Sequence, residues 1–292
     1  MSQKLLVTGA SGFLGWNLCQ IASKDWDVYG VYHTRQIAIP NTTLVKADLT
    51  NDQDRQSLFQ TYRPDAVIHL AAESSPNRCQ EQPEFSHSIN VIAAREMARQ
   101  CAHANIPFVF ASSDQVFDGR HSPYREDDPP SPVNLYGEQK AQAEAEVLSC
   151  HPKAAVCRMP LMFGAVPPTA STFLQGFIKT LRDGGELKLF VDEFRTPVSG
   201  TTAAKGLLLA LEKVQGYLHL GGKERISRYE FGRLMVEIFE LPAAGLIPSY
   251  QKDVTMSAPR PSDVSFDSSK AFALGYAPPS IQKELEALRG VL

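Results

Sequence analysis

Tyr136 and Lys140 form the pair of side chains in this sequence that is best suited to move a proton. They lie four residues apart in a segment with a helical pattern, and positions i and i+4 share one helix face. A free tyrosine has a pKa of about 10, which is high for proton transfer near neutral pH. A nearby ammonium group favours the phenolate and lowers that pKa. We therefore expect Tyr136 to act as acid or base and Lys140 as its electrostatic partner.

Ser113 completes this group, because it ends a predicted strand and carries a hydroxyl that can hold a carbonyl or alcohol oxygen beside Tyr136. The Tyr-x-x-x-Lys spacing alone is common by chance. It gains weight here from the serine upstream and from a glycine-rich loop near the start of the chain. The three residues predict a hydride-transfer site, in which Lys140 can also bond the ribose of a nicotinamide cofactor.

The glycine-rich loop joins an apolar run, Leu5–Thr8, to a segment with a helical pattern. A helix N-terminus that follows a tight loop binds anions, because its first amides lack partners and its dipole favours negative charge. Gly9 would allow the sharp turn, Gly12 the approach of a pyrophosphate, and Gly15 the close packing of helix on strand. We expect the cofactor to contact Gly9, Ser11, Gly12, Phe13, Leu14 and Gly15.

Other candidate cofactor residues stand at the ends of the next predicted strands. His33 and Arg35 follow a strand at 26–32, and no acidic residue occurs between 28 and 45. An arginine at this point accommodates the 2′-phosphate, so NADP(H) is predicted, with NAD(H) left open. Asp48 could accept a hydrogen bond from the adenine amino group. The remaining expected contacts are Leu49, Ala71 and Ala72 at strand ends and Asn90 in a long helix at 83–104.

Strands and helices alternate along the first 160 residues, with strands at 4–8, 26–32, 43–49, 65–72, 106–112 and 154–159. This alternation predicts an α/β fold with a doubly wound parallel sheet of the Rossmann type. A helix at 200–213 and a strand at 216–220 extend it. Helical patterns at 171–183, 227–240 and 280–290 predict a smaller C-terminal lobe. We assign 1–160 and about 191–223 to an NAD(P)-binding domain, and about 161–190 and 224–292 to a substrate-binding lobe.

Composition narrows the function classes. Of the 292 residues 43% are hydrophobic and 21% charged, and the net charge is −3, which gives no support for nucleic-acid or membrane-surface binding. Apolar runs stay well below the roughly 18 residues of a membrane span. The first strand begins by residue 4, so we expect no signal peptide and a cytoplasmic location. Five scattered cysteines indicate reduced thiols, and no His/Cys cluster has metal-ligand spacing.

Three segments together resemble the extended short-chain dehydrogenase/reductases: residues 8–15 (TGASGFLG), 112–119 (SSDQVFDG) and the Tyr136/Lys140 pair. Within that family the chain is similar to the dTDP-4-dehydrorhamnose reductase branch, also at 123–128 (PYREDD) and 260–270 (RPSDVSFDSSK). That resemblance implies reduction of the 4-keto group of a dTDP-linked 6-deoxy sugar bound between the two lobes. It places Asp114, Val116, Phe117, Arg158, Arg195 and Arg260 near the substrate. The branch usually has threonine where this chain has Ser113, and both carry a hydroxyl.

A second resemblance leaves the function open. Residues 71–73 (AAE), 124–126 (YRE), 134–137 (NLYG) and 158–160 (RMP) are similar to the regulatory beta subunit of methionine adenosyltransferase. That family shares the fold and the bound nucleotide but acts as a partner of another enzyme. Three alternatives therefore stand: a keto-sugar reductase, a sugar-nucleotide epimerase or dehydratase, and a regulatory subunit without turnover. Some reductases of this branch form a homodimer with Mg²⁺ at the interface, although no residue here indicates that metal.

Overall fold

Strand β1 (Lys4–Thr8) shows why a parallel sheet forms. Its side chains are buried on both faces, with Leu5 and Val7 in one hydrophobic cluster and Leu6 in the other. A strand covered on both sides is typical of a parallel sheet with helices on each face. The computed structural model describes residues 2–168, 170 and 172–291.

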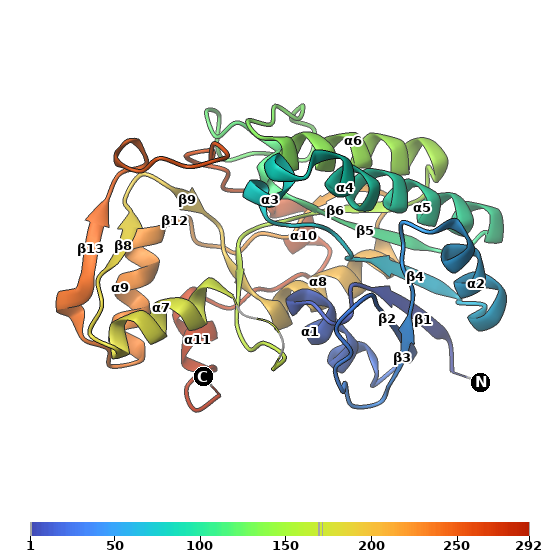
Figure 1. Ribbon diagram of the computed structural model, residues 1–292, viewed down its shortest axis with the longest axis horizontal. Coiled ribbons are helices and arrows are strands. Elements are labelled where there is room, and N and C mark those ends of the chain that lie inside the picture. Colours follow the sequence, from blue (N-terminus) through green and yellow to red (C-terminus); the bar gives the residue numbers. More distant parts are fainter. Residues whose placement is uncertain (1, 169, 171, 292) are drawn as a thin grey trace.

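The central sheet contains seven strands, and every pairing in it is parallel. This confirms the predicted α/β fold with a doubly wound sheet (Figure 1). In spatial order the strands are β11 (Gly216–His219), β6 (Ala155–Met159), β5 (Phe108–Ser113), β4 (Ala66–His69), β1, β2 (Asp27–Tyr32) and β3 (Thr42–Lys46).

Helices cover both faces of this sheet (Figure 1). On one face α1 (Phe13–Ala22) packs on α8 (Gly200–Lys213), and α10 (Ser269–Ala273) contacts β11. The other face carries α2 (Asp52–Tyr62), α5 (Ala93–Ala104) and α6 (Leu135–Cys150), with α3 (Pro76–Glu81) and α4 (Pro83–His87) against α6. No helix in the described ranges is long and apolar enough to cross a membrane.

A smaller lobe lies to the left in Figure 1 and has its own hydrophobic cluster. Strands β8 and β13 pair in parallel at its centre, and three helices pack around them. The elements are α7 (Phe173–Arg182), β8 (Leu187–Phe190), α9 (Arg228–Ile238), β13 (Leu246–Ser249) and α11 (Ile281–Glu286). The roles assigned to the two lobes stay predictions. Ala271 and Tyr276, on the smaller lobe's side of the predicted boundary, join the core of the large sheet.

Short two-residue strands, which no pattern in the sequence predicts, complete the fold. Two pairs form, one parallel and one antiparallel, which connect the lobes. They are β7 (Met162–Phe163) with β10 (Val198–Ser199), and β9 (Phe194–Arg195) with β12 (Ile226–Ser227). The remaining short elements are the 3₁₀ turns η2 (Asp114–Val116), η3 (Ala243–Gly245) and η4 (Gln251–Asp253).

Two predicted strands end earlier than expected, because side chains take over their backbone hydrogen bonds. After β3, the amide of Asp48 donates to the carboxylate of Asp54 at 2.7 Å. After β4, the amides of Leu70 and Ala71 donate to the Thr8 hydroxyl at 3.0 and 3.2 Å. Both strands therefore turn away into loops at the carboxyl edge of the sheet.

The helix predicted over 83–104 is continuous but not α-helical throughout. Between α4 and α5 the chain forms a π-helical turn, η1 (Ser88–Ile92), which contains Asn90. The Asn90 amide bonds the backbone N–H and carbonyl of Glu73 and also the Gln139 side chain. π-turns inside α-helices occur frequently at functional sites. Here the turn fixes the chain segment that follows β4.

Candidate active site

A cavity of about 730 Å³ opens at the carboxyl edge of the sheet and reaches the smaller lobe. The predicted site residues that line it come from both lobes: Gly9, Ser11, Gly12, Phe13, Leu14, Gly15, His33, Asp48, Leu49, Ala71, Ala72, Ser113, Asp114, Tyr136, Lys140, Arg195 and Arg260. In doubly wound folds ligands bind at this edge. The topology thus brings together most of the residues that the sequence singled out.

The glycine-rich loop forms one wall of the cavity, and its backbone leaves no room for larger side chains at two positions. Gly9 has φ +70°, and a Cβ there would lie 2.9 Å from the Ala71 amide nitrogen. A Cβ on Gly15 would lie 2.2 Å from the Gly9 carbonyl oxygen. The loop can therefore lie against the segment after β4 and against the first turn of α1 only with glycine at both positions.

Tyr136 reaches the cavity because α6 begins beside the end of β5. The Asn134 side chain caps this helix by accepting from the Gly137 amide at 2.9 Å, and it also donates to Gln115 and to the Pro259 carbonyl. The cap thus ties the first turn of α6 to the turn after β5. Tyr136 and Ser113 both line the cavity as a result.

Lys140 lies one helical turn after Tyr136 on α6, and its side chain is buried. Its ammonium donates to the Ala111 carbonyl at 2.7 Å and lies 3.9 Å from the centre of the Phe110 ring. Burial lowers the pKa of Lys140 to about 7, against an opposing contribution from Glu144. The side chain therefore faces the cavity from a site that disfavours its charge.

The electrostatic expectation for Tyr136 needs correction. Burial raises the pKa of Tyr136 above its ordinary value, and the negative charge of Asp114 adds to this, while the Ser113 hydroxyl opposes it. In the protein without ligands, Tyr136 is therefore a protonated phenol, which suits a proton donor better than a base.

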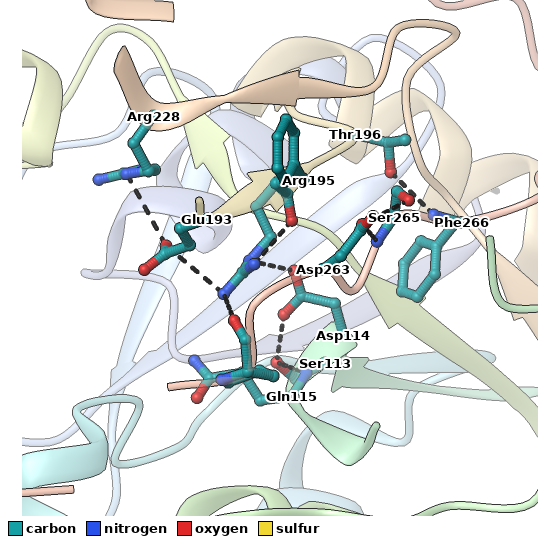
Figure 2. A network of polar contacts seen from close by, with 12 residues as sticks. Ser113, Asp114, Gln115, Glu193, Arg195, Thr196, Arg228, Asp263, Ser265 and Phe266 are labelled. Carbon is teal, nitrogen blue, oxygen red and sulfur yellow. Dashed lines mark hydrogen bonds and ion pairs between the residues drawn. The ribbon is translucent and has the colours of Figure 1, made fainter. Parts of the chain in front are cut away.

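Buried charges form a network where the two lobes meet (Figure 2). Arg195 Nε lies 3.5 Å from Asp114 Oδ2, and Arg195 Nη2 lies 3.4 Å from Glu193 Oε1. Glu193 also faces Arg228, at 3.9 Å. Burial raises the pKa of Asp114 to about 6, although Arg195 and the hydrogen bond from Ser113 favour its ionised form.

The arginines of this region differ in what they contact. Arg260 donates to Asn77 of α3 at 3.0 Å and to the Ala258 carbonyl. Arg228 Nη1 is buried, and no residue in the described part of the chain accepts a hydrogen bond from it. An unpartnered guanidinium nitrogen at a cavity wall is suited to accept an anionic ligand.

Five predicted site residues lie outside the lining of this cavity: Val116, Phe117, Asn90, Arg158 and Arg35. Val116 and Phe117 are buried in a hydrophobic cluster with Tyr124, Val264 and Phe266. They attach the loop after β5 to the C-terminal segment. As described above, Asn90 holds the chain after β4 rather than facing the cavity.

Arg158 is the fourth of these residues. Its guanidinium bonds the Glu144 carboxylate at 2.9 Å, with both side chains almost completely buried. It also stacks on Phe117 and Tyr217. A sequence match alone could not separate this structural ion pair from a substrate contact.

His33 and Arg35 follow β2 and are placed differently. His33 lines the cavity and lies 3.7 Å from the Asp48 carboxylate, whereas Arg35 is exposed and outside the lining. Of these two residues, only His33 therefore contributes to the lining of the cavity.

Several lining residues were not predicted from the sequence. They include Glu73, Ser74, Phe85, Gln115, Glu193 and Arg228. Glu73 directly follows the predicted pair Ala71–Ala72, and this adjacency could have indicated that Glu73 also lines the cavity. Glu193 and Arg228 had no such signal, because only the packing of the two lobes against each other brings them to the cavity.

Comparison with known proteins identifies relatives along almost the whole chain. The family model for the RmlD substrate binding domain matches residues 3–289. The beta subunit of methionine adenosyltransferase 2 from Xenopus laevis is 33% identical over 283 residues, covering 94% of this chain and 83% of the relative. A protein from Haloferax volcanii described as the probable low-salt glycan biosynthesis reductase Agl14 is 30% identical over 288 residues, covering 97% and 96%.

Solved structures agree on the fold. A hypothetical dTDP-4-dehydrorhamnose reductase from Sulfolobus tokodaii has a TM-score of 0.82 at 31% identity, covering 93% of this chain and 94% of that one. The dTDP-4-dehydrorhamnose reductase from Bacillus anthracis, solved in complex with NADP, has a TM-score of 0.88 over the whole of both chains at 22% identity. The family match, these relatives and the shared architecture lead to one conclusion: this chain is a member of the RmlD substrate-binding-domain family.

Proposed function

We propose that this protein is an NADPH-dependent reductase of a nucleotide-linked 4-keto-6-deoxy sugar. One observation carries the proposal: a single cavity contains the glycine-rich loop and also Ser113, Tyr136 and Lys140. When bound, NADPH supplies the hydride that reduces the C4 carbonyl. Tyr136, protonated in its buried setting, gives its phenolic proton to the carbonyl oxygen, and Ser113 orients that oxygen.

The residues around the loop fit a dinucleotide. Gly12 precedes the first turn of α1 and has no side chain to cap it, so the helix amides remain available to a pyrophosphate. The small side chains of Ala71 and Ala72 leave room for the cofactor beside them. Lys140 would bond the nicotinamide ribose, and Asp48 the adenine amino group.

The smaller lobe, together with β9, supplies groups that suit the other substrate. Arg195, Arg228 and Arg260 line the same cavity from segments far apart in the sequence. Guanidinium groups bind diphosphates through paired hydrogen bonds. We assign the nucleotide diphosphate of the sugar to this arginine group, which places the sugar between it and Tyr136.

The direct test is oxidation of NADPH by the purified protein with dTDP-4-keto-6-deoxyglucose and its epimers, made in place from dTDP-glucose by a dehydratase and an epimerase. We expect loss of NADPH absorbance that depends on the sugar. A control without the sugar corrects for spontaneous oxidation. If NADPH binds tightly but no keto sugar is turned over, the reductase proposal is wrong.

Replacing Arg35 by alanine tests the cofactor preference. If Arg35 holds the 2′-phosphate, R35A should weaken NADPH binding by about 10- to 150-fold, since a charge-assisted hydrogen bond contributes about 1.5–3 kcal/mol. NADH binding should change little. Binding can be measured by fluorescence of the reduced nicotinamide. R182A, an exposed arginine on α7, is the matched control. Equal losses for both cofactors would show that Arg35 does not contact the phosphate.

A regulatory subunit without turnover is the second candidate, and its support is the similarity to the beta subunit of methionine adenosyltransferase 2. Such a protein would bind NADP(H) and leave every keto sugar unchanged. The epimerase or dehydratase alternative predicts a tightly held NAD that is recycled within the site. The oxidation assay separates both from a reductase, because only a reductase consumes NADPH in proportion to the sugar.

A further inference from the structure

The arginines that line the cavity differ in how many of their N–H groups already have a partner. Arg195 is buried, and each of its side-chain nitrogens faces an acceptor of the protein. Nη1 donates to the Phe194 carbonyl at 2.6 Å and Nη2 to the Pro261 carbonyl at 3.1 Å, while Nε lies 3.5 Å from Asp114 Oδ2. The N–H groups of a guanidinium point outward in one fixed plane, so Arg195 could turn to a ligand only by giving up these contacts. Its contacts therefore tie β9 to the chain around Pro261.

Arg228 lines the same cavity but has few such contacts. Its Nε lies 3.9 Å from Glu193 Oε1, which is too far for a hydrogen bond. Among the residues that the structure describes, none accepts a hydrogen bond from the buried Nη1. Figure 2 shows Arg228 joined to the charge network through Glu193. Because 15% of the Arg228 side chain is exposed, a ligand in the cavity can reach it.

Two aromatic rings and the start of α9 hold the Arg228 guanidinium in place. Its Cζ atom lies 4.2 Å from the centre of the Phe173 ring and 5.5 Å from that of Phe177, both on α7. The Arg228 amide donates to the Glu193 carbonyl at 3.0 Å. Burial lowers the pKa of Arg228 to about 10, against an opposing contribution from Glu193, so the side chain is cationic at neutral pH. A cation that is already held in place loses little conformational entropy when it binds an anion.

Glu193 opposes the binding of an anion at this point. Its Oε1 lies 3.4 Å from Arg195 Nη2 and 3.9 Å from Arg228 Nε. Its Oε2 accepts a hydrogen bond from Gln251 at 3.2 Å. The carboxylate is thus a counter-charge shared by two guanidinium groups. Because like charges repel strongly in a buried site, it also repels a phosphate that approaches Arg228.

We propose that, within the arginine group, Arg228 rather than Arg195 donates directly to the diphosphate of the nucleotide sugar, and that Glu193 limits the affinity. This inference rests on the proposed function, because it takes the nucleotide diphosphate as the anion in the cavity. Arg260 donates through Nη1 and Nη2 to Ala258 and Asn77, which leaves only part of its donors for a ligand. Arg195 keeps its contacts within the protein when the ligand binds.

The first test measures binding and needs no turnover. NADPH is titrated into the free protein by calorimetry, and dTDP and UDP are titrated into protein saturated with NADPH. R228M keeps an unbranched side chain on the two phenylalanine rings and removes the charge, so it should weaken binding of both nucleoside diphosphates by about 10- to 150-fold. NADPH affinity should change little. R233M, at an exposed position of the same helix, is the matched control and should leave all affinities unchanged.

Two further variants test the roles of Glu193 and Arg195. E193Q should tighten binding of dTDP and UDP by about two- to fivefold at low salt, because it removes a negative charge beside Arg228. R195M should lower the unfolding temperature more than R228M does, since it takes the counter-charge from buried Asp114, whereas R228M leaves Glu193 paired with Arg195.

The outcomes distinguish this inference from the proposed function. Unchanged diphosphate binding in R228M, weaker binding in E193Q, or a loss of NADPH binding in R228M overturns the inference. If R228M loses the diphosphates as expected but wild-type protein turns over no keto sugar, the inference holds and the proposed reductase is wrong. Wild-type protein that binds neither dTDP nor UDP contradicts both.

Discussion

Replacing Tyr136 by phenylalanine is expected to lower keto-sugar reduction by about 10²–10⁴-fold, the usual contribution of a positioned acid. The variant keeps the buried aromatic ring and removes only the hydroxyl that would protonate the substrate oxygen. NADPH affinity should change little. The measurement is steady-state NADPH oxidation, combined with a binding titration on the same sample.

Tyr217 provides the matched control for this substitution. It lies on β11 outside the cavity lining, and its ring packs against Arg158. Y217F should therefore keep near wild-type turnover. Unchanged turnover in Y136F would remove Tyr136 from the proton-donating role and leave the cavity as a binding site only.

Replacing Arg158 by methionine is expected to lower the free energy of unfolding by about 3–5 kcal/mol, because it leaves the Glu144 carboxylate buried without its partner. The guanidinium bonds Glu144 through both Nε and Nη2, and its Nη1 faces His219 at 3.3 Å. Burial and the charge of Arg158 lower the pKa of His219 to about 3, so His219 is neutral and accepts this contact. Urea unfolding measures the loss.

Two further variants make this stability test specific. R158M/E144L replaces both charges with apolar groups and should recover much of the lost stability, since no charge is then left unpaired. R99A removes a half-exposed partner of Glu96 on α5 and should cost less than about 1 kcal/mol. If R158M costs no more than R99A, the ion pair does not stabilise the core, and Arg158 would again be open to a role in binding.

Much of the fold could be predicted because its signals are local. The continuous apolar strands, the glycine-rich turn and the alternation of strand and helix each depend on a few neighbouring residues. Where side chains from elsewhere intervene, the prediction was less accurate. β4 is shorter because the Thr8 hydroxyl takes two amides of the following segment, and the helix around Asn90 contains a π-turn because that side chain bonds Glu73 and Gln139.

The features of the candidate site also fall into two groups: those that follow from the local sequence and those that depend on tertiary packing. By itself the sequence determined the doubly wound fold, the loop at Gly9–Gly15 and the spacing of Tyr136 from Lys140, since strand order and helix periodicity fix these relations. Only the tertiary structure decided that Arg158 pairs with Glu144 and that Glu193 and Arg228 reach the cavity. It also decided the direction in which the pKa of Tyr136 shifts. Burial and long-range charge depend on the packing of both lobes, and no local pattern of residues encodes them.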